Sequence, residues 1–298
     1  MKYSSPTASV CDLSSVKQRR QGGFTLVELM IAITVTLILV AGIVGMIFSL
    51  TNSFSTQDAL TQIQENERFS LSVLDSTIRN AGYFPGAETF TSPSGASFST
   101  PAGGQLSAYP ATTVKNSDGT VFSAGQLIVG TTNAGGSDTI NVRVVAPAGG
   151  TITNCQGDLN TTNAAIVWTS SLSINASNQL VCTVSTNGGA PGTATILADN
   201  VSLMKIVYGL QTQVPNCRSP QQAPALNVDA YIDASGLSAP QTPQSCWALG
   251  YVTPINWMYV MSVQVTLTFV NTVVTNPSAA TPVTLTPIVH TIYMMNVT

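Results

Sequence analysis

The distribution of apolar and charged residues sets one stretch of the chain apart from the rest. The sequence contains an apolar run from Leu29 to Leu50, and no charged residue occurs between Glu28 and Asp58. At about 1.5 Å per residue, a helix of this length spans roughly 33 Å, enough for a hydrocarbon core of about 30 Å. The run therefore predicts a membrane-spanning helix with a carboxylate, Glu28, at its beginning.

After this run, the apolar residues take the spacing of an amphipathic helix. Apolar or small residues recur mostly at intervals of three and four, which keeps one helix face apolar: Leu60, Ile63, Leu71, Leu74, Ile78 and Ala81. Asp75 and Arg79 stand four residues apart, in the order that favours an ion pair. Gly82 suits a left-handed helix cap. We expect one helix from about Phe24 to Ala81, with its second half packed on a globular head.

Farther along the chain, a period of two marks half-buried strands. Ile140, Val142 and Val144 alternate with Asn141 and Arg143. The same pattern extends over 263–269, and other candidate strands are Gln126–Gly130, Ala165–Trp168, Leu180–Val184, Leu203–Tyr208 and His290–Val297. Residues 84–125 are rich in Gly, Pro, Ser and Thr and predict loops with short strands. The fold class expected is α+β: a long N-terminal α-helix, transmembrane in its first half and amphipathic in its second, packed on an antiparallel β-sheet head.

Composition supports an exported protein. Only 8% of the 298 residues are charged, and the chain holds 23 Gly and 16 Pro, which suits an extracytoplasmic β-rich protein. Removal of residues 1–23 would change the count from 10 basic and 13 acidic residues to 6 and 12, a net charge of −6. No basic patch remains for nucleic acid, so no nucleic-acid partner is expected. Residues 211–257 are interpreted as a long excursion of one head.

The charges before the apolar run predict its orientation. Lys17, Arg19 and Arg20 precede the run, whereas no Lys or Arg follows it until Arg68, so the N-terminus is expected in the cytoplasm. The competing interpretation is a cleaved secretory signal, whose apolar region is about 7–15 residues long and ends at a small-x-small site. This run is longer and ends in Phe48-Ser49-Leu50-Thr51-Asn52. Export without release is the better interpretation.

Four cysteines follow the first 23 residues: Cys155, Cys182, Cys217 and Cys246. An even number in an exported domain predicts two disulfides, for which three connectivities are possible. We favour sequential neighbours, Cys155 with Cys182 and Cys217 with Cys246. A zinc site has little support, because the sequence has no Cys-x-x-Cys pair and its one histidine is His290.

The stretch Gly22-Gly23-Phe24-Thr25-Leu26-Val27-Glu28 resembles the type IV prepilin signature. The resemblance implies that a leader peptidase cuts after Gly23 and methylates the new N-terminal Phe24. It also implies that Glu28, fifth in the mature chain, pairs with the positive N-terminus of an adjacent subunit. The alternative is an ordinary signal anchor that contains a glutamate, which would require the Gly, Phe and Glu positions to coincide by accident.

Two later segments, Gln64–Leu71 and Ile78–Tyr83, are similar to the helix-to-head segment of PilW-like minor pilins. This implies a structural subunit that helps prime a type IV pilus and is incorporated at or near its tip. Its implied partners are other minor pilins, the major pilin, the prepilin peptidase/methylase and the inner membrane. The implied organisation is a cleaved leader (1–23), a long helix (24–82) with a transmembrane segment at about 29–50, and a periplasmic head (83–298).

No pattern of catalytic or cofactor-binding residues stands out, so neither an enzyme nor a cofactor nor a metal is expected. His290 fits a sheet position. Asp229 and Asp233 flank Tyr231 and are interpreted as solvated loop acids, with a divalent-ion site as the less favoured alternative. Two other functions remain open: a J-type pseudopilin of type II secretion, and an adhesin or receptor module at a pilus tip.

Overall fold

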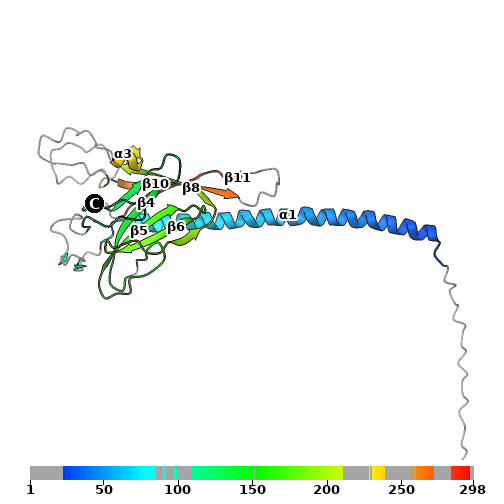
Figure 1. Ribbon diagram of the computed structural model, residues 1–298, viewed down its shortest axis with the longest axis horizontal. Coiled ribbons are helices and arrows are strands. Elements are labelled where there is room, and N and C mark those ends of the chain that lie inside the picture. The colour runs from blue at the N-terminus through cyan, green and yellow to red at the C-terminus, as the bar shows by residue number, and fades with distance from the viewer. Residues whose placement is uncertain are drawn as a thin grey trace, which may run out of the picture. The chain divides into compact units, whose positions relative to one another are not determined.

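The computed structural model describes residues 23–84, 90–91, 97–98, 109–150, 152–210, 228, 230–238, 257, 260–271 and 283–295. The chain divides into two compact units, Met1–Ser53 and Phe54–Thr298. The predicted α+β class is confirmed, since one long helix is followed by antiparallel sheets (Figure 1). The two units are described separately below.

Helix α1 (Leu26–Arg79) carries the apolar run and continues into the second unit. It begins two residues later than the predicted Phe24, because Thr25 stands before it as the capping residue. All side chains from residue 23 to residue 53 are exposed. Of the helices that the structure describes, α1 is the one long and apolar enough to cross a membrane.

The C-terminal end of α1 is fixed by Gly82, as predicted. Gly82 has φ of 72°, the left-handed conformation that suits glycine. Its N–H donates to the carbonyl of Arg143 at 2.9 Å, and the carbonyl of Tyr83 accepts from Val145 N at 3.0 Å. A Cβ on residue 82 would lie 2.5 Å from Cδ1 of Leu127. The chain therefore leaves the helix hydrogen-bonded to strand β4 (Thr139–Ala146).

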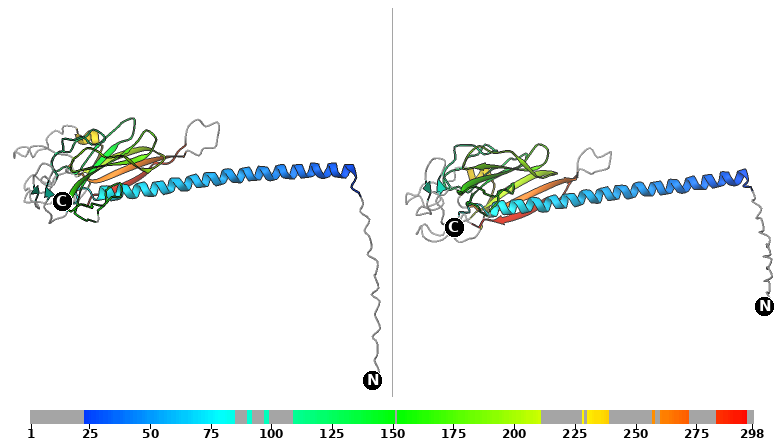
Figure 2. Two further views of the ribbon diagram at one scale, coloured as in Figure 1. Left: turned by 60° about the horizontal axis from the view of Figure 1, so that its bottom comes forward. Right: turned by 90° about the horizontal axis from the view of Figure 1, so that it is seen from below.

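The described residues of the second unit include two five-stranded antiparallel sheets, and Figures 1 and 2 show their strands as arrows. The first has the order β3-β4-β5-β6-β7, with β3 Ile128–Thr131, β5 Ile166–Ile174, β6 Leu180–Thr186 and β7 Thr195–Ala198. The second has the order β11-β10-β8-β9, with β12 also paired to β10: β8 Val201–Leu210, β9 Ala230–Ile232, β10 Val260–Asn271, β11 Val283–Thr284 and β12 Ile288–Tyr293. The pair β1 (Phe90–Thr91) and β2 (Ser97–Phe98) and the short helix α3 (Ala234–Ser238) are the remaining described elements.

Each predicted strand overlaps an observed one, but the strands form two main sheets where one was expected. Strands β7 and β8 belong to different sheets although only Asp199 and Asn200 separate them. Asn200 has φ of 63°, a conformation that asparagine tolerates better than most residues. This tight turn carries the chain from one sheet to the other. Alternation within a strand predicts which of its sides is buried. It does not predict which strands pair with it, so it could not distinguish one sheet from two.

The second half of α1 supplies one side of the hydrophobic core. Ile63, Leu74 and Ile78 pack in one cluster with residues of both sheets, and Figure 2 shows this cyan part of the helix beside the strands. The predicted stripe is wrong at Leu60, which is 40% exposed, because Ala59 takes the buried place one residue earlier. Ser70 is also buried; its hydroxyl donates to the Asn66 carbonyl at 2.6 Å and is thereby satisfied.

Strand β4 differs from the half-buried strand that its alternation predicts, because it is buried on both faces. Asn141 and Arg143 were expected on the polar, exposed side, and their exposed fractions are 0% and 1%. The segment 109–126 covers them through hydrogen bonds to both side chains. This cover comes from a separate segment of the chain and includes the buried rings of Tyr109 and Phe122, so the alternation of β4 could not predict it.

Candidate functional site

The first candidate site is the start of α1, where Glu28 occupies the third helical position. The backbone N–H of Glu28 donates to Oγ1 of Thr25 at 3.3 Å, and Leu29 N donates to the Thr25 carbonyl at 3.2 Å. Thr25 is therefore the N-cap, and Thr25-Leu26-Val27-Glu28 has the spacing of a capping box. An acid in the first turn also complements the positive end of the helix dipole. The signal for this cap in the sequence is the spacing of Thr25 and Glu28, three residues apart.

The Glu28 carboxylate has no hydrogen-bond or ion-pair partner within the described part of the chain. Its surroundings are apolar and exposed: Phe24 is 82% exposed, and Leu26, Val27, Leu29 and Met30 are each more than half exposed. An acid on an apolar helix that enters a bilayer is costly unless it meets a partner or has a function. The arrangement leaves Glu28 available to a cation from outside this chain.

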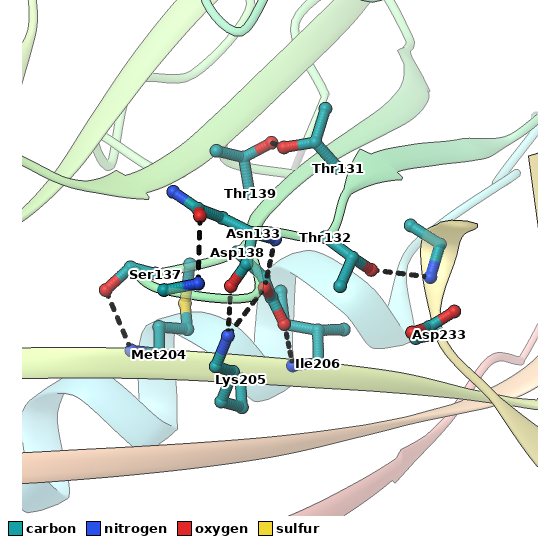
Figure 3. A network of polar contacts seen from close by, with 12 residues as sticks. Thr131, Thr132, Asn133, Ser137, Asp138, Thr139, Met204, Lys205, Ile206 and Asp233 are labelled. Carbon is teal, nitrogen blue, oxygen red and sulfur yellow. Dashed lines mark hydrogen bonds and ion pairs between the residues drawn. The ribbon is translucent and has the colours of Figure 1, made fainter. Parts of the chain in front are cut away.

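A second group of polar residues joins the two sheets, and no sequence pattern predicted it (Figure 3). The Asp138 carboxylate is only 2% exposed and accepts hydrogen bonds from Asn133 N at 2.9 Å and Ile206 N at 2.8 Å. Lys205 Nζ lies 3.3 Å from Asp138 Oδ1 and also donates to the Asn133 carbonyl. Met204 N donates to Ser137 Oγ at 3.1 Å. The turn before β4 is thus fastened to β8 of the other sheet.

Arg143 fastens the 109–126 segment onto β4. Its guanidinium donates to the carbonyls of Pro110 at 2.7 Å, Ser123 at 3.1 Å and Gln126 at 2.9 Å. The same group lies 4.2 Å from the ring centroid of Phe122, within cation–π range. Burial lowers the pKa of Arg143 to about 9, which leaves it charged at neutral pH. Arg143 therefore has a structural role in covering β4.

The sequence also drew attention to several charged residues and one histidine of the second unit, and those that the structure describes have partners within the chain. Arg79 donates to Asp75 at 2.8 and 3.0 Å, as its spacing predicted, and these bonds lower the pKa of Asp75. His290 lies on β12, as expected, with Nε2 3.5 Å from Asp75 Oδ1. Asp233 caps α3 by accepting from Gly236 N at 2.8 Å, which lowers its pKa. Asp229 lies outside the described residues.

Cys155 and Cys182 form a disulfide, with their Cα atoms 6.1 Å apart. This is the first of the two pairings that the sequence favoured. Cys217 and Cys246 lie outside the described residues, as does most of the predicted leader. Among the residues that the structure describes, no three His, Cys, Asp or Glu side chains gather in a way that could hold a metal ion.

The comparisons with known proteins bear on the start of α1. Residues 18–44 match the family model described as the prokaryotic N-terminal methylation motif. The matched range contains Gly23, Phe24 and Glu28, and it extends well into the apolar part of α1. A comparison with curated proteins found no match.

The matched motif is a type IV prepilin-like leader, and the match supports a type IV pilin-like or pseudopilin protein. Proteins with this leader are processed by a prepilin peptidase and assemble with other pilins. They are structural subunits anchored in a membrane by the apolar helix, and they are generally not enzymes. The start of α1 is therefore the candidate site that the comparison supports.

Proposed function

We propose that the protein is a minor pilin that helps prime assembly of a type IV pilus and is incorporated at or near its tip. The observation that carries the proposal is the methylation motif at 18–44, which extends into the exposed apolar part of α1. The segment similar to PilW-like minor pilins gives further support. It spans the part of α1 where Asn66 Nδ2 donates to the Asp199 carbonyl at 3.3 Å and where the Arg79 carbonyl accepts a hydrogen bond from Met295 N at 3.1 Å.

In this proposal, residues 1–23 are a leader that the peptidase removes by cutting between Gly23 and Phe24. The new Phe24 amine is then N-methylated. Residues 24–82 contain the long helix, with residues 29–50 in the inner membrane, and residues 83–298 form the periplasmic head. The basic residues Lys17, Arg19 and Arg20 support a cytoplasmic N-terminus. A single pass is supported by α1, the one described helix that is long and apolar enough to cross a membrane.

Assembly in this proposal depends on a contact between Glu28 and the Phe24 amine of an adjacent subunit. The methylated amine keeps its positive charge, and the carboxylate has no described partner within its own chain. In the low dielectric of a helix bundle, an ion pair is much stronger than it is in water. The contact satisfies both charges, and it fixes the axial offset between neighbouring helices.

Recovery of the protein in surface fibres tests this function. Epitope-tagged full-length protein is produced in the native cell, fibres are sheared from the surface, and both fibres and detergent-solubilised membranes are analysed. We expect the protein in the fibre fraction at low copy number relative to the major pilin, and together with other minor pilins in the membrane fraction. Its absence from fibres, together with co-isolation with a secretion platform, would instead support a J-type pseudopilin.

A further inference from the structure

The loop 152–162 is held rigidly against one face of the first sheet by three kinds of anchor. The Cys155–Cys182 disulfide joins it to β6. Gln156 Nε2 donates to the carbonyls of Cys182 at 3.1 Å and Thr193 at 2.9 Å. Asn160 Nδ2 donates to the Ala146, Pro147 and Ala164 carbonyls at 2.9 to 3.0 Å.

Hydrogen bonds within the loop fix its shape as well. Asn154 Oδ1 accepts from the backbone N–H groups of Gln156 at 2.9 Å and Asp158 at 3.0 Å. Gly157 has φ of 87°, a left-handed conformation suited to glycine, and Thr153 forms a β-bridge with Leu159. A loop with this many fixed points loses little conformational freedom when a ligand binds. Such preorganisation is a property of binding sites.

Between this loop and strands β5 and β6 lies a shallow pocket of about 300 Å³, the lower end of the range for small-molecule sites. Trp168 and Val184 line it from the strands, and Leu159 on the loop is 50% exposed. The rest of the lining consists of amide, hydroxyl and carboxylate side chains with one further apolar residue: Asn154, Gln156, Asp158, Asn160, Thr161, Thr162, Ile166 and Thr186.

Several lining groups keep unused hydrogen-bonding capacity. Asp158 Oδ2 accepts from Asn154, whereas Asp158 Oδ1 has no partner among the described residues. The hydroxyls of Thr161 and Thr186 are likewise without a partner in the part of the chain that the structure describes. Among the residues that the structure describes, the lining contains one acid, Asp158, and no Lys, Arg or His. A ligand of this pocket therefore needs polar groups that both donate and accept, and it needs no negative charge.

We propose that this pocket binds a neutral saccharide unit. Sugar hydroxyls both donate and accept, and they match the Asp158 carboxylate and the Thr161 and Thr186 hydroxyls of the lining. The C–H face of a pyranose ring is apolar and matches the side chains of Leu159, Ile166 and Val184. An anionic ligand would be repelled by Asp158 and would find no cation in the lining. The site lies in the second unit and does not depend on the proposed role in pilus assembly.

Direct binding to the full-length protein tests the site. The protein is held in a detergent without a sugar headgroup and titrated with glucose, galactose, mannose and N-acetylglucosamine, with sialic acid as the anionic comparison. Binding is measured by saturation-transfer NMR and calorimetry. We expect a neutral sugar to bind with a Kd of about 1 mM, as suits a ligand of about a dozen heavy atoms, and sialic acid to bind at least about tenfold more weakly.

Two variants separate the site from the rest of the surface. D158N removes the charge and one acceptor, and T186V removes a lining hydroxyl; each should weaken binding about tenfold or more. D199N is the matched control, because the Asp199 carboxylate also accepts a single side-chain amide bond, from Gln179 at 2.7 Å, outside the pocket. Equal thermal unfolding midpoints show that the variants are folded. Failure of all four neutral sugars to bind, or equal binding by D158N, T186V and wild type, would overturn the proposal.

Discussion

E28A is expected to reduce incorporation of the protein into surface fibres at least about tenfold, while its amount in the membrane and its leader cleavage stay unchanged. In the proposed assembly, the variant leaves the Phe24 amine of the adjacent subunit without its carboxylate partner in an apolar environment. Insertion scales place the cost of a charged side chain at the bilayer centre at about 2.5–3.5 kcal/mol, and about 1.4 kcal/mol already corresponds to a tenfold change in an equilibrium. Quantitative immunoblots of sheared fibres and membranes give the measurement.

Thr25-Leu26-Val27-Glu28 has the spacing of a capping box, so the charge of Glu28 and the capping of the helix need separate variants. T25A removes the side chain that accepts from Glu28 N at 3.3 Å and keeps the carboxylate. E28Q keeps the side-chain shape and removes the charge. We expect E28Q to be as defective as E28A, and T25A to retain most incorporation, because loss of an N-cap costs only about 1 kcal/mol. A severe defect in T25A with normal assembly in E28Q would assign Glu28 to helix capping alone.

D138A is expected to lower the free energy of unfolding of the second unit by about 3–5 kcal/mol. The substitution removes a carboxylate that is 2% exposed and leaves Asn133 N and Ile206 N without acceptors. It also leaves Lys205 without its carboxylate partner at 3.3 Å. At about 2–4 °C per kcal/mol for a unit of this size, the thermal midpoint should fall by roughly 6–20 °C.

The control for D138A is D199N in the turn between β7 and β8. Asp199 lies at the surface and its carboxylate accepts one side-chain bond, from Gln179, so its substitution should change stability by no more than about 0.5 kcal/mol. Circular dichroism of the detergent-solubilised protein during heating compares the variants. An unchanged midpoint in D138A would mean that the contact between the β3–β4 turn and β8 contributes little to joining the two sheets.

The elements that could be predicted from the sequence are those whose signal is local. The segment Gly23–Glu28 is a linear motif. The apolar run and the helix cap at Gly82 are likewise encoded by residues adjacent in the sequence. The strand β10 follows directly from its alternation. The pairing of Cys155 with Cys182 could be favoured because no other cysteine stands between them in the sequence.

The features that could not be predicted depend on residues distant in sequence. Asp138 contacts β8 about seventy positions later, and nothing in its own neighbourhood marks it as buried. Arg143 looked like an exposed residue because the alternation of β4 cannot reveal that the 109–126 segment covers it. The pocket above Trp168 combines a loop with two strands that follow it in the chain, and its polar lining resembles ordinary loop sequence. In each case the tertiary contact overrides the local pattern.

The most direct test of the central claim is the mass of the N-terminal peptide of the protein isolated from the membrane fraction. The functional site is proposed to lie at Gly23, Phe24 and Glu28, and each later step of assembly requires the free amine that cleavage creates. The expected result is a mature chain that begins with N-methylated Phe24. A chain that retains Met1 and the leader, or one that begins after the apolar run, would contradict this role.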